Sequence, residues 1–287
     1  MTLPLGFTVG HWTDPVALTG CTVILCDGAA TAGVHIGGGA PATIQTDIIG
    51  PASATGILHA VLLTGGSAFG LAAYDGVMRF LEERGVGVPV REWRVPHVAG
   101  AVIFDLATGD GKVRPDANAG YAACGMATAD PAEGLVGAGT GATTAKLKGG
   151  RAPGGLGLAS ARAGAATVTA VMVVNALGDI WDGERNEWVA RSAPAALPPV
   201  QGNTTIGAVL TDAKLGREAV RRIAMTAHDG LGRAIRPAHT DLDGDTIFAL
   251  AHGEQEANPL ELQIAAADAV EKAIVRAVRA SSGTMKA

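Results

Sequence analysis

Strand-like and helix-like segments alternate along this chain without repeating as regular strand–helix–strand units. Patterns typical of strands occur at residues 21–26, 32–36, 101–105, 167–174, 204–210 and 245–251. Patterns typical of helices occur at residues 67–85, 214–226 and 259–281. This irregular order favours an α+β layered fold over a doubly wound parallel sheet. The length of 287 residues fits one large domain or two closely associated ones.

Small side chains dominate the composition. The chain contains 41 glycines and only 4% aromatic residues, although 48% of its residues are hydrophobic. Small side chains allow the layers of a core to approach closely. The formal net charge is −5 and no basic tract stands out, so the sequence lacks the charge pattern of a nucleic-acid-binding protein.

The cysteines and the apolar segments indicate a cytoplasmic protein. Cys21, Cys26 and Cys124 form no C-x-x-C pair, and three thiols leave one unpaired in any disulfide scheme. Residues 1–10 lack the basic and apolar regions of a signal peptide, and the apolar stretch 165–177 is too short to span a bilayer. We therefore expect a soluble protein of the reducing cytosol with no membrane partner.

One clear break interrupts the chain before the strand pattern at 204–210. Residues 191–202 (RSAPAALPPVQG) are rich in proline, alanine and serine and show no periodicity, as expected for a surface connector. Asn203 and Thr204 follow directly. Asn is a common turn residue and Thr favours strands, so this junction fits an ordinary strand start. It also fits a site of self-processing.

In the self-processing interpretation, the Thr204 hydroxyl attacks the Asn203 carbonyl, and water hydrolyses the resulting ester. Thr204 then becomes a free amino terminus. An α-amine has an unperturbed pKa of about 7.7–8.0, so part of it is neutral at working pH and can serve as general base for the hydroxyl beside it. Thr204 would thus supply both nucleophile and base in the hydrolysis of an amide.

Three further groups of polar residues have side chains suited to this chemistry. Asp243 and Asp245 lie in the segment DLDGDT, where carboxylates can orient an α-amine and neutralise its charged form. Asn175 ends an apolar strand pattern, and its amide is well suited to donate to an oxyanion. Lys146 follows a glycine-rich stretch, although the neighbouring Lys148 leaves open a role as a surface charge.

Three other patterns are incomplete as functional motifs. Residues 136–142 contain G-x-G-x-x-A, but no acidic residue occurs between 147 and 177 to bind a ribose hydroxyl. Ser67 lacks the glycine two positions later that a nucleophile elbow requires, and it fits a helix cap instead. His228, His239 and His252 lack metal-ligand spacing and are expected to be structural. We therefore expect no metal and no organic cofactor.

Six segments, taken together and in this order, resemble the DmpA-type L-aminopeptidase/D-esterase family, which includes β-aminopeptidases and nylon-oligomer endohydrolases. The resemblance extends from about Gly10 to the last helix. The segments are VGHWTD, LTGGSAFGLAAYDGVMRFLEE, GAGTGATTAK, VVNALGD, GNTTIGAVLTDA and AHDGLGRAIRPAHTDLDGDTIFALAHG.

This resemblance implies a four-layer αββα sandwich, similar to N-terminal-nucleophile hydrolases but with DmpA-type connectivity. It further implies a single hydrolase domain, 1–287, that cleaves itself into an α chain, 1–203, and a β chain, 204–287. The two chains would remain associated and assemble into a homo-oligomer of αβ units. Thr204 would open the β chain as the nucleophile.

The same matching assigns roles to the polar residues. It makes Asn175 the amide that supports the oxyanion, Lys146 the lysine of the nylon-oligomer hydrolases, and Asp243 with Asp245 their paired aspartates. Tyr121 matches an active-site tyrosine and is a possible substrate-pocket residue.

Thr204 departs from the serine that aminopeptidase members typically use, which places the chain nearer the nylon-oligomer branch. The predicted function is hydrolysis of a small amide or peptide through an acyl-enzyme on Thr204. The alternatives are a non-catalytic small-molecule binding or assembly protein on the same fold, and a serine hydrolase that uses Ser67.

Overall fold

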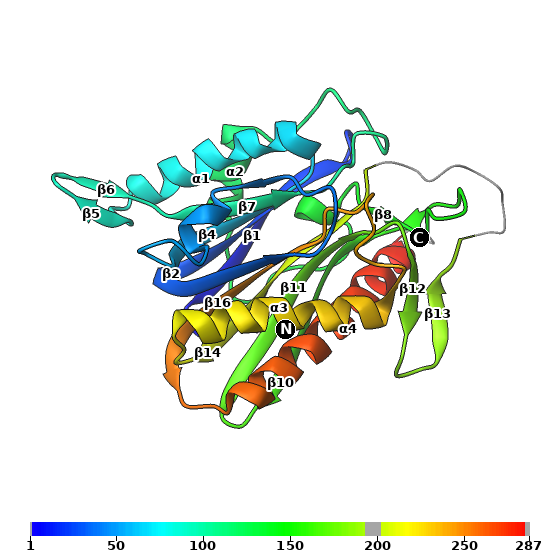
Figure 1. Ribbon diagram of the computed structural model, residues 1–287. Coiled ribbons are helices and arrows are strands. Elements are labelled where there is room, and N and C mark those ends of the chain that lie inside the picture. The colour runs from blue at the N-terminus through cyan, green and yellow to red at the C-terminus, as the bar shows by residue number, and fades with distance from the viewer. Residues whose placement is uncertain (1, 193–201, 285–287) are drawn as a thin grey trace.

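The computed structural model describes residues 2–192 and 202–284 (Figure 1). Most of the predicted connector at 191–202 lies outside these described residues. Its last residue, Gly202, leads directly into strand β14 (Thr204–Ala213).

Within the described residues, nine strands form the main sheet, in the order β10-β11-β14-β16-β2-β4-β7-β3, with β1 also paired to β2. Their bounds are β1 (Phe7–Asp14), β2 (Thr19–Ile36), β3 (Thr43–Ile44), β4 (Ile57–Thr64), β7 (Val98–Val102), β10 (Gly155–Ala163), β11 (Ala166–Asn175), β14 and β16 (Thr246–Gln255). Three smaller sheets contain β5 (Val88–Val90) with β6 (Trp93–Val95), β8 (Thr143–Thr144) with β9 (Ala152–Pro153), and β13 (Glu187–Ala190) with β12 (Asp179–Asp182) and β15 (Ile235–Arg236).

The long strand β2 belongs to both halves of the main sheet. Its residues 31–36 pair with β16 and residues 19–26 with β1, whereas residues 21–25 and 30–31 pair with β4. The register with β4 shifts between Leu25 and Ala30, where Gly28 has a φ of 80°. This bulge lets one strand pass from one half to the other, so that the two halves face each other across a shared core.

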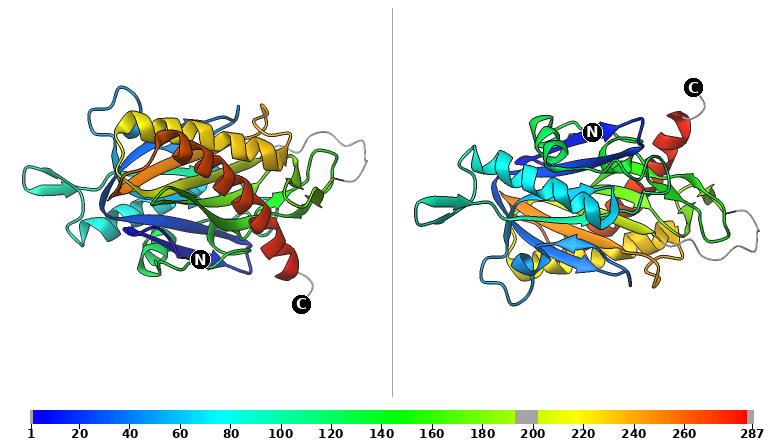
Figure 2. Two further views of the ribbon diagram at one scale, coloured as in Figure 1. Left: turned by 90° about the horizontal axis from the view of Figure 1, so that it is seen from below. Right: turned by 90° about the horizontal axis from the view of Figure 1, so that it is seen from above.

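Two pairs of helices cover the outer faces, which gives four layers (Figure 1). One face carries α1 (Ala73–Glu82) and α2 (Ala117–Gly125), and the other carries α3 (Arg217–Ala234) and α4 (Pro259–Thr284). In Figure 2, α3 and α4 lie in front of the strands in the view from below (left), and α1 and α2 are on the near side in the view from above (right). The predicted αββα architecture is therefore confirmed.

Alternate residues of each strand enter different cores, as the two-residue period of a strand requires. On β11, Val171 and Val173 face the core between the two halves, whereas Ala170 and Met172 face α3 and α4. On β2, Ile24 enters the central core and Val23 packs towards α1 and α2. Three buried layers of apolar side chains thus separate the four layers of secondary structure.

Glycines permit the closest contacts between layers. A Cβ atom added to Gly157 of β10 would lie 2.2 Å from the carbonyl oxygen of Ala273 in α4. One added to Gly230 of α3 would lie 2.0 Å from the carbonyl oxygen of Ala267. The small-residue composition therefore has the predicted consequence that helices pack directly against strands and against each other.

Most predicted elements are present, with three local corrections. The break expected between the strand patterns at 21–26 and 32–36 is absent, because β2 continues through residues 27–31 with a bulge. The strand expected at 101–105 is β7, which begins at Val98 and ends at Val102. Ser67 does not act as a helix cap: Gly66 is the N-cap, and no side chain caps the 3₁₀ turn Ser67–Ala72 that leads into α1. In the described part of the chain, no helix is long and apolar enough to cross a membrane.

Candidate active site

Thr204 and Asn175 lie opposite each other at the ends of two paired strands. β11 and β14 are antiparallel, and their register pairs Asn175 with Thr204. Both strands are rich in valine and other apolar residues and are buried on both faces, so their polar ends are held rigidly within the fold. Asn175 is fully buried and Thr204 is 6% exposed.

The carbonyl of Asn203, immediately before Thr204, is held in place by two groups. The main-chain N–H of Gly244 donates to its oxygen at 3.0 Å, and the Thr204 hydroxyl also contacts that oxygen. Asn203 forms an isolated parallel bridge with Asp243. The peptide bond between Asn203 and Thr204 is thus buried, hydrogen-bonded and adjacent to a hydroxyl.

Asp245 anchors the chain on the other side of Thr204. Its Oδ1 accepts a hydrogen bond from the main-chain N–H of Thr205 at 2.7 Å. Its Oδ2 lies 2.8 Å from Nδ1 of His239 and accepts from the main-chain N–H of the same residue at 3.0 Å. The segment from Asp243 to Asp245 therefore contacts the chain both before and after Thr204.

Asp243 is the second carboxyl group of this segment. Its Oδ1 accepts from the main-chain N–H of Leu177 at 3.3 Å, and its Oδ2 accepts from the hydroxyl and main-chain N–H of Thr240. Burial, followed by the nearby charge of Asp245, raises the pKa of Asp243 above its ordinary value.

Every polar atom of the Asn175 side chain has a partner. Its Nδ2 donates to the carbonyl oxygens of Phe104 and Gly202, both at 3.2 Å. Its Oδ1 accepts from the main-chain N–H of Thr143 at 3.0 Å and from Nζ of Lys146 at 3.1 Å. In the uncleaved chain, Asn175 thus pairs with β14 and its side-chain amide connects Lys146 with Gly202, two positions before Thr204.

Lys146 is buried inside this cluster. Only 3% of the residue is exposed, and its Nζ donates to the main-chain oxygen and to Oδ1 of Asn175, both at 3.1 Å. Burial is the main cause that lowers the pKa of Lys146 to about 7, with Arg151 adding to this effect and Asp243 opposing it. The alternative of a surface charge is therefore wrong for Lys146, whereas Lys148 is exposed.

The structure brings together five of the predicted site residues, but it does not bring Tyr121 to them. Tyr121 lies on α2, where its hydroxyl donates to Glu83 at 2.6 Å and its ring packs against Phe80 and beneath Arg79. These contacts tie α2 to α1 and give Tyr121 no hydrogen bond to the other five residues; its role in a substrate pocket stays a prediction.

A small cavity of about 20 Å³ adjoins the cluster, large enough for about one water molecule. Its walls come from the segment after β7, from β8 and the turn between β8 and β9, and from Gly202. The lining residues are Phe104, Ala107, Thr108, Thr143, Lys146, Arg151 and Gly202.

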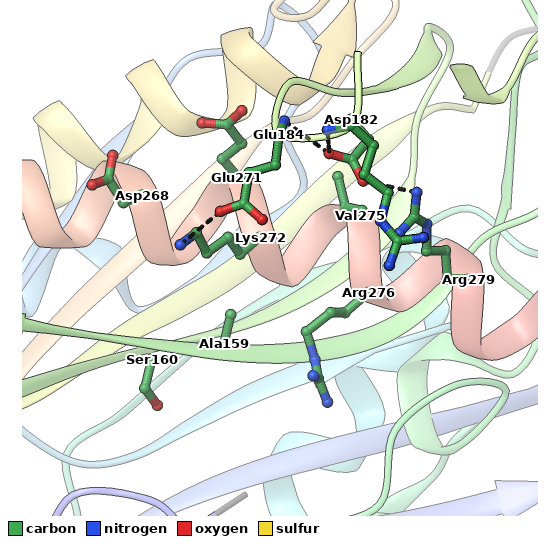
Figure 3. Close-up of a pocket in the computed structure, with 11 residues that line it drawn as sticks. Ala159, Ser160, Asp182, Glu184, Asp268, Glu271, Lys272, Val275, Arg276 and Arg279 are labelled. Atoms are coloured by element: carbon green, nitrogen blue, oxygen red, sulfur yellow. Dashed lines mark hydrogen bonds and ion pairs between the residues drawn. The ribbon is translucent and has the colours of Figure 1, made fainter. Parts of the chain in front are cut away.

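A larger cavity of about 480 Å³ lies elsewhere, between α4, β10 and the segment after β12 (Figure 3). Its charged side chains form ion pairs with one another, such as Lys272 with Glu184 at 2.9 Å and Arg279 with Asp182 at 2.8 Å. Lys146 and Gly202 line the small cavity, so the small cavity, and not the larger one, adjoins the cluster around Thr204.

Sequence patterns gave no functional role to three residues of this site. Gly244 has no side chain that could indicate a role, yet its N–H donates to the Asn203 carbonyl. Phe104 had no distinguishing pattern, and its ring lies against Gly202. His239 was expected to be structural, and only the fold of the loop before β16 brings it to Asp245. Within the described residues, no group of three His, Cys, Asp or Glu side chains could hold a metal ion.

Comparison with solved structures defines the class of fold. The chain superimposes on an L-aminopeptidase D-Ala-esterase/amidase from Ochrobactrum anthropi, described as a variant of the N-terminal-nucleophile hydrolase fold, with a TM-score of 0.76 and 22% identity. 

The superposition with that enzyme covers 98% of this chain and 88% of the other. A β-aminopeptidase from a Burkholderia species gives a TM-score of 0.73 with 25% identity, over 97% of this chain and 85% of the other. The four layers are therefore those of an N-terminal-nucleophile hydrolase fold.

Comparison of sequences identifies the family. The model of peptidase family S58 matches residues 5–287. An uncharacterized aminopeptidase of Mycobacterium tuberculosis (strain H37Rv) is 44% identical, over 96% of this chain and 88% of its own length. A 6-aminohexanoate-oligomer endohydrolase of a Kocuria species is 33% identical, over 87% of this chain and 74% of its own length. The chain belongs to peptidase family S58 and is a hydrolase of amide or peptide bonds.

Proposed function

We propose that this protein cleaves its own chain between Asn203 and Thr204, and that the new amino-terminal Thr204 then hydrolyses a small amide or peptide through an acyl-enzyme ester. One observation carries this proposal: the Asn203–Thr204 peptide is held by the Gly244 N–H before the bond and by the Asp245 carboxylate after it, with the Thr204 hydroxyl in contact with the Asn203 carbonyl oxygen. An ordinary strand start does not require such an arrangement.

Self-cleavage needs a base other than the α-amine, because Thr204 has no α-amine until the chain is cut. Lys146 fits this role. A neutral lysine amine has two N–H donors and one lone pair, and the two donors match the two Asn175 oxygens that Nζ contacts. The lone pair is then free to accept a proton. Its pKa of about 7 keeps a large part of Lys146 neutral at working pH.

The proposed cleavage proceeds in two steps. Thr204 Oγ1 attacks the Asn203 carbonyl carbon and its proton passes to Lys146, while the Gly244 N–H stabilises the developing oxyanion. The C–N bond then breaks as the amide nitrogen takes up a proton, which leaves Asn203 esterified to Thr204. Water hydrolyses this ester and releases the Asn203 carboxylate.

Turnover of substrate repeats the same chemistry with a different base. The α-amine of Thr204 accepts the hydroxyl proton, and Oγ1 attacks the substrate carbonyl carbon. The substrate C–N bond then breaks, the amine leaves with the proton that the α-amine returns, and the acyl group remains as an ester on Oγ1. Water hydrolyses this ester, which releases the acid and restores Thr204. Departure of Gly202 would release one Asn175 N–H from its carbonyl partner, so that Asn175 can donate to the substrate oxyanion. Asp243 and Asp245 hold the segment that surrounds the α-amine.

The relatives support a small amide or peptide as substrate, since their names include aminopeptidases and hydrolases of 6-aminohexanoate oligomers. We further propose that residues 1–203 and 204–287 remain associated after cleavage, that the resulting units form a homo-oligomer, and that the protein acts in the cytoplasm. The three cysteines are buried free thiols, as expected in a reducing compartment.

Trapping the acyl-enzyme tests this function. We expect a p-nitroanilide of a short amino acid, mixed with the enzyme and quenched in acid, to add one acyl mass to the peptide that begins with Thr204. A protein that binds such amides without releasing nitroaniline and without forming the ester would instead be the non-catalytic binding protein. Labelling of Ser67 by a serine-directed phosphonate, with loss of activity, would favour the serine hydrolase.

A further inference from the structure

A chain of hydrogen bonds runs from Asp245 through two histidines to the main chain of β2. Asp245 Oδ2 lies 2.8 Å from His239 Nδ1. Nε2 of His239 lies 3.2 Å from Nδ1 of His228 on α3, and Nε2 of His228 lies 3.0 Å from the carbonyl oxygen of His35. All four ring nitrogens of His228 and His239 are therefore engaged.

Counting protons shows that this chain carries a positive charge. The two ends, a carboxylate and a carbonyl oxygen, only accept, so the ring nitrogens that face them must each carry a hydrogen. The contact between the rings needs one further hydrogen. Two neutral imidazoles hold two hydrogens in total, whereas the three contacts require three. One of the two rings must therefore be an imidazolium when Asp245 is a carboxylate.

The charge resides on His239. Burial, reinforced by the nearby His239, lowers the pKa of His228 to about 4. The hydrogen bond to Asp245 raises the pKa of His239, and Asp243 adds to this effect. His35 is the other titratable group nearby, and its pKa is lowered by burial and then by His239. His228 is thus a neutral acceptor towards His239 and a donor towards the His35 carbonyl.

The packing leaves room for both rings and little else. A Cβ atom added to Gly37, just beyond β2, would lie 2.9 Å from Nδ1 of His228 and 3.0 Å from Nδ1 of His239. The ring centroids of His228 and His239 are 4.8 Å apart. His239 remains 29% exposed as a side chain, so it can exchange protons with solvent, whereas Asp245 is 2% exposed.

This charged pair connects to the nucleophile through a single carboxylate. Asp245 uses its other oxygen, Oδ1, to accept the N–H of Thr205, the residue after Thr204. A shift of the carboxylate would therefore move the start of β14. The imidazolium on one oxygen fixes the position of the other oxygen, and thereby the main chain beside the Thr204 hydroxyl.

We infer that His239, as an imidazolium supported by His228, is a positioning residue for the reaction at Thr204. This inference rests on the proposed function of Thr204. Loss of the His239 proton breaks one of the three contacts, so the structure predicts an alkaline limb in the pH profile, in addition to the acid limb set by the bases Lys146 and the α-amine. Because the pKa of His239 is raised, the stabilisation is complete at acid pH and is lost as pH rises through that pKa.

The variant His239→Asn tests the inference, since an asparagine amide can still donate to Asp245 but cannot carry or lose the charge. We expect kcat to fall about 10- to 100-fold, a range typical of small displacements of reacting groups, with KM little changed and the alkaline limb absent. The matched control is His252→Asn, because His252 bonds to the Ala29 carbonyl and contacts Phe7, away from the site. An unchanged kcat and alkaline limb in His239→Asn would overturn the inference.

A second measurement needs no variant enzyme to be active. Histidine-selective ¹⁵N NMR of the wild-type protein reports the protonation of each of its seven histidines. We expect the His239 imidazolium to persist to a higher pH than that of an ordinary histidine, whose pKa is about 6.5. A His239 ring that is neutral at pH 6.5 would overturn the inference even if hydrolysis occurs. If the proposed function of Thr204 is wrong, the result is different: the chain neither cleaves itself nor hydrolyses amides, although His239 keeps its charge.

Discussion

The main-chain N–H of Gly244 donates a hydrogen bond to the carbonyl oxygen of Asn203 at 3.0 Å. This donor lies where negative charge would develop if Thr204 attacked that carbonyl. Gly244 also has no space for a side chain: a Cβ atom would lie 2.7 Å from the Ala40 carbonyl oxygen and 2.9 Å from Thr204 Oγ1. A glycine at this position therefore serves both the hydrogen bond and the approach of the hydroxyl.

The substitution Gly244→Ala should slow self-cleavage by about 100-fold or more, because the added methyl group displaces the N–H or the hydroxyl. The fraction of cleaved chain over time, measured by mass spectrometry, checks this. Gly232→Ala on α3 is the matched control, since nothing lies within 4 Å of its added Cβ. Cleavage of Gly244→Ala at the rate of this control would contradict the role of the Gly244 N–H.

The substitution Asn175→Ala should reduce turnover per cleaved molecule about 100- to 1000-fold, the usual cost of removing an oxyanion donor. It should also lower stability by about 1–3 kcal/mol, because the Thr143 N–H loses its buried acceptor. Thermal unfolding would still be cooperative. Normal turnover in Asn175→Ala would remove Asn175 from the mechanism.

Self-cleavage should accelerate as pH rises through about 7. The pKa of Lys146 is lowered to about 7, so the neutral amine that can accept a proton predominates only above that pH. Lys146→Arg remains charged at all working pH and should cleave at least about 100-fold more slowly. The exposed neighbour provides the control Lys148→Arg. A cleavage rate independent of pH between 5 and 9, tested on the wild-type chain, would exclude Lys146 as the base.

Local periodicity was sufficient to predict most of the fold. The apolar run at 167–174 and the amphipathic pattern at 259–281 correspond to β11 and α4, because each pattern reflects burial along a single element. The four-layer arrangement followed from the family resemblance and is confirmed. The separate strand patterns at 21–26 and 32–36 form the single strand β2, because pairing with strands on both sides outweighs the local preference of Asp27-Gly28 for a turn.

The candidate site was predictable where its residues have distinctive chemistry. Asn175 is a polar residue at the end of an apolar strand pattern, and Lys146 was selected by the family resemblance. The structure joins the two by hydrogen bonds and pairs Asn175 with Thr204. Gly244 acts through its main chain, which a side-chain pattern cannot reveal. His239 meets His228 only because α3 and the loop before β16 fold onto each other. The prediction for Tyr121 rested on a single matched residue, and its ring packs against Phe80 of α1.

The intact mass of the purified protein under denaturing conditions tests the central claim most directly. Cleavage after Asn203 divides the 28.7 kDa chain of 287 residues into pieces of roughly 20 and 8 kDa. The account predicts both pieces for the wild type, the smaller beginning with Thr204, and a single uncut chain for Thr204→Ala. A wild-type chain that stays at 28.7 kDa after long incubation, or a Thr204→Ala chain cut at the same bond, would contradict it.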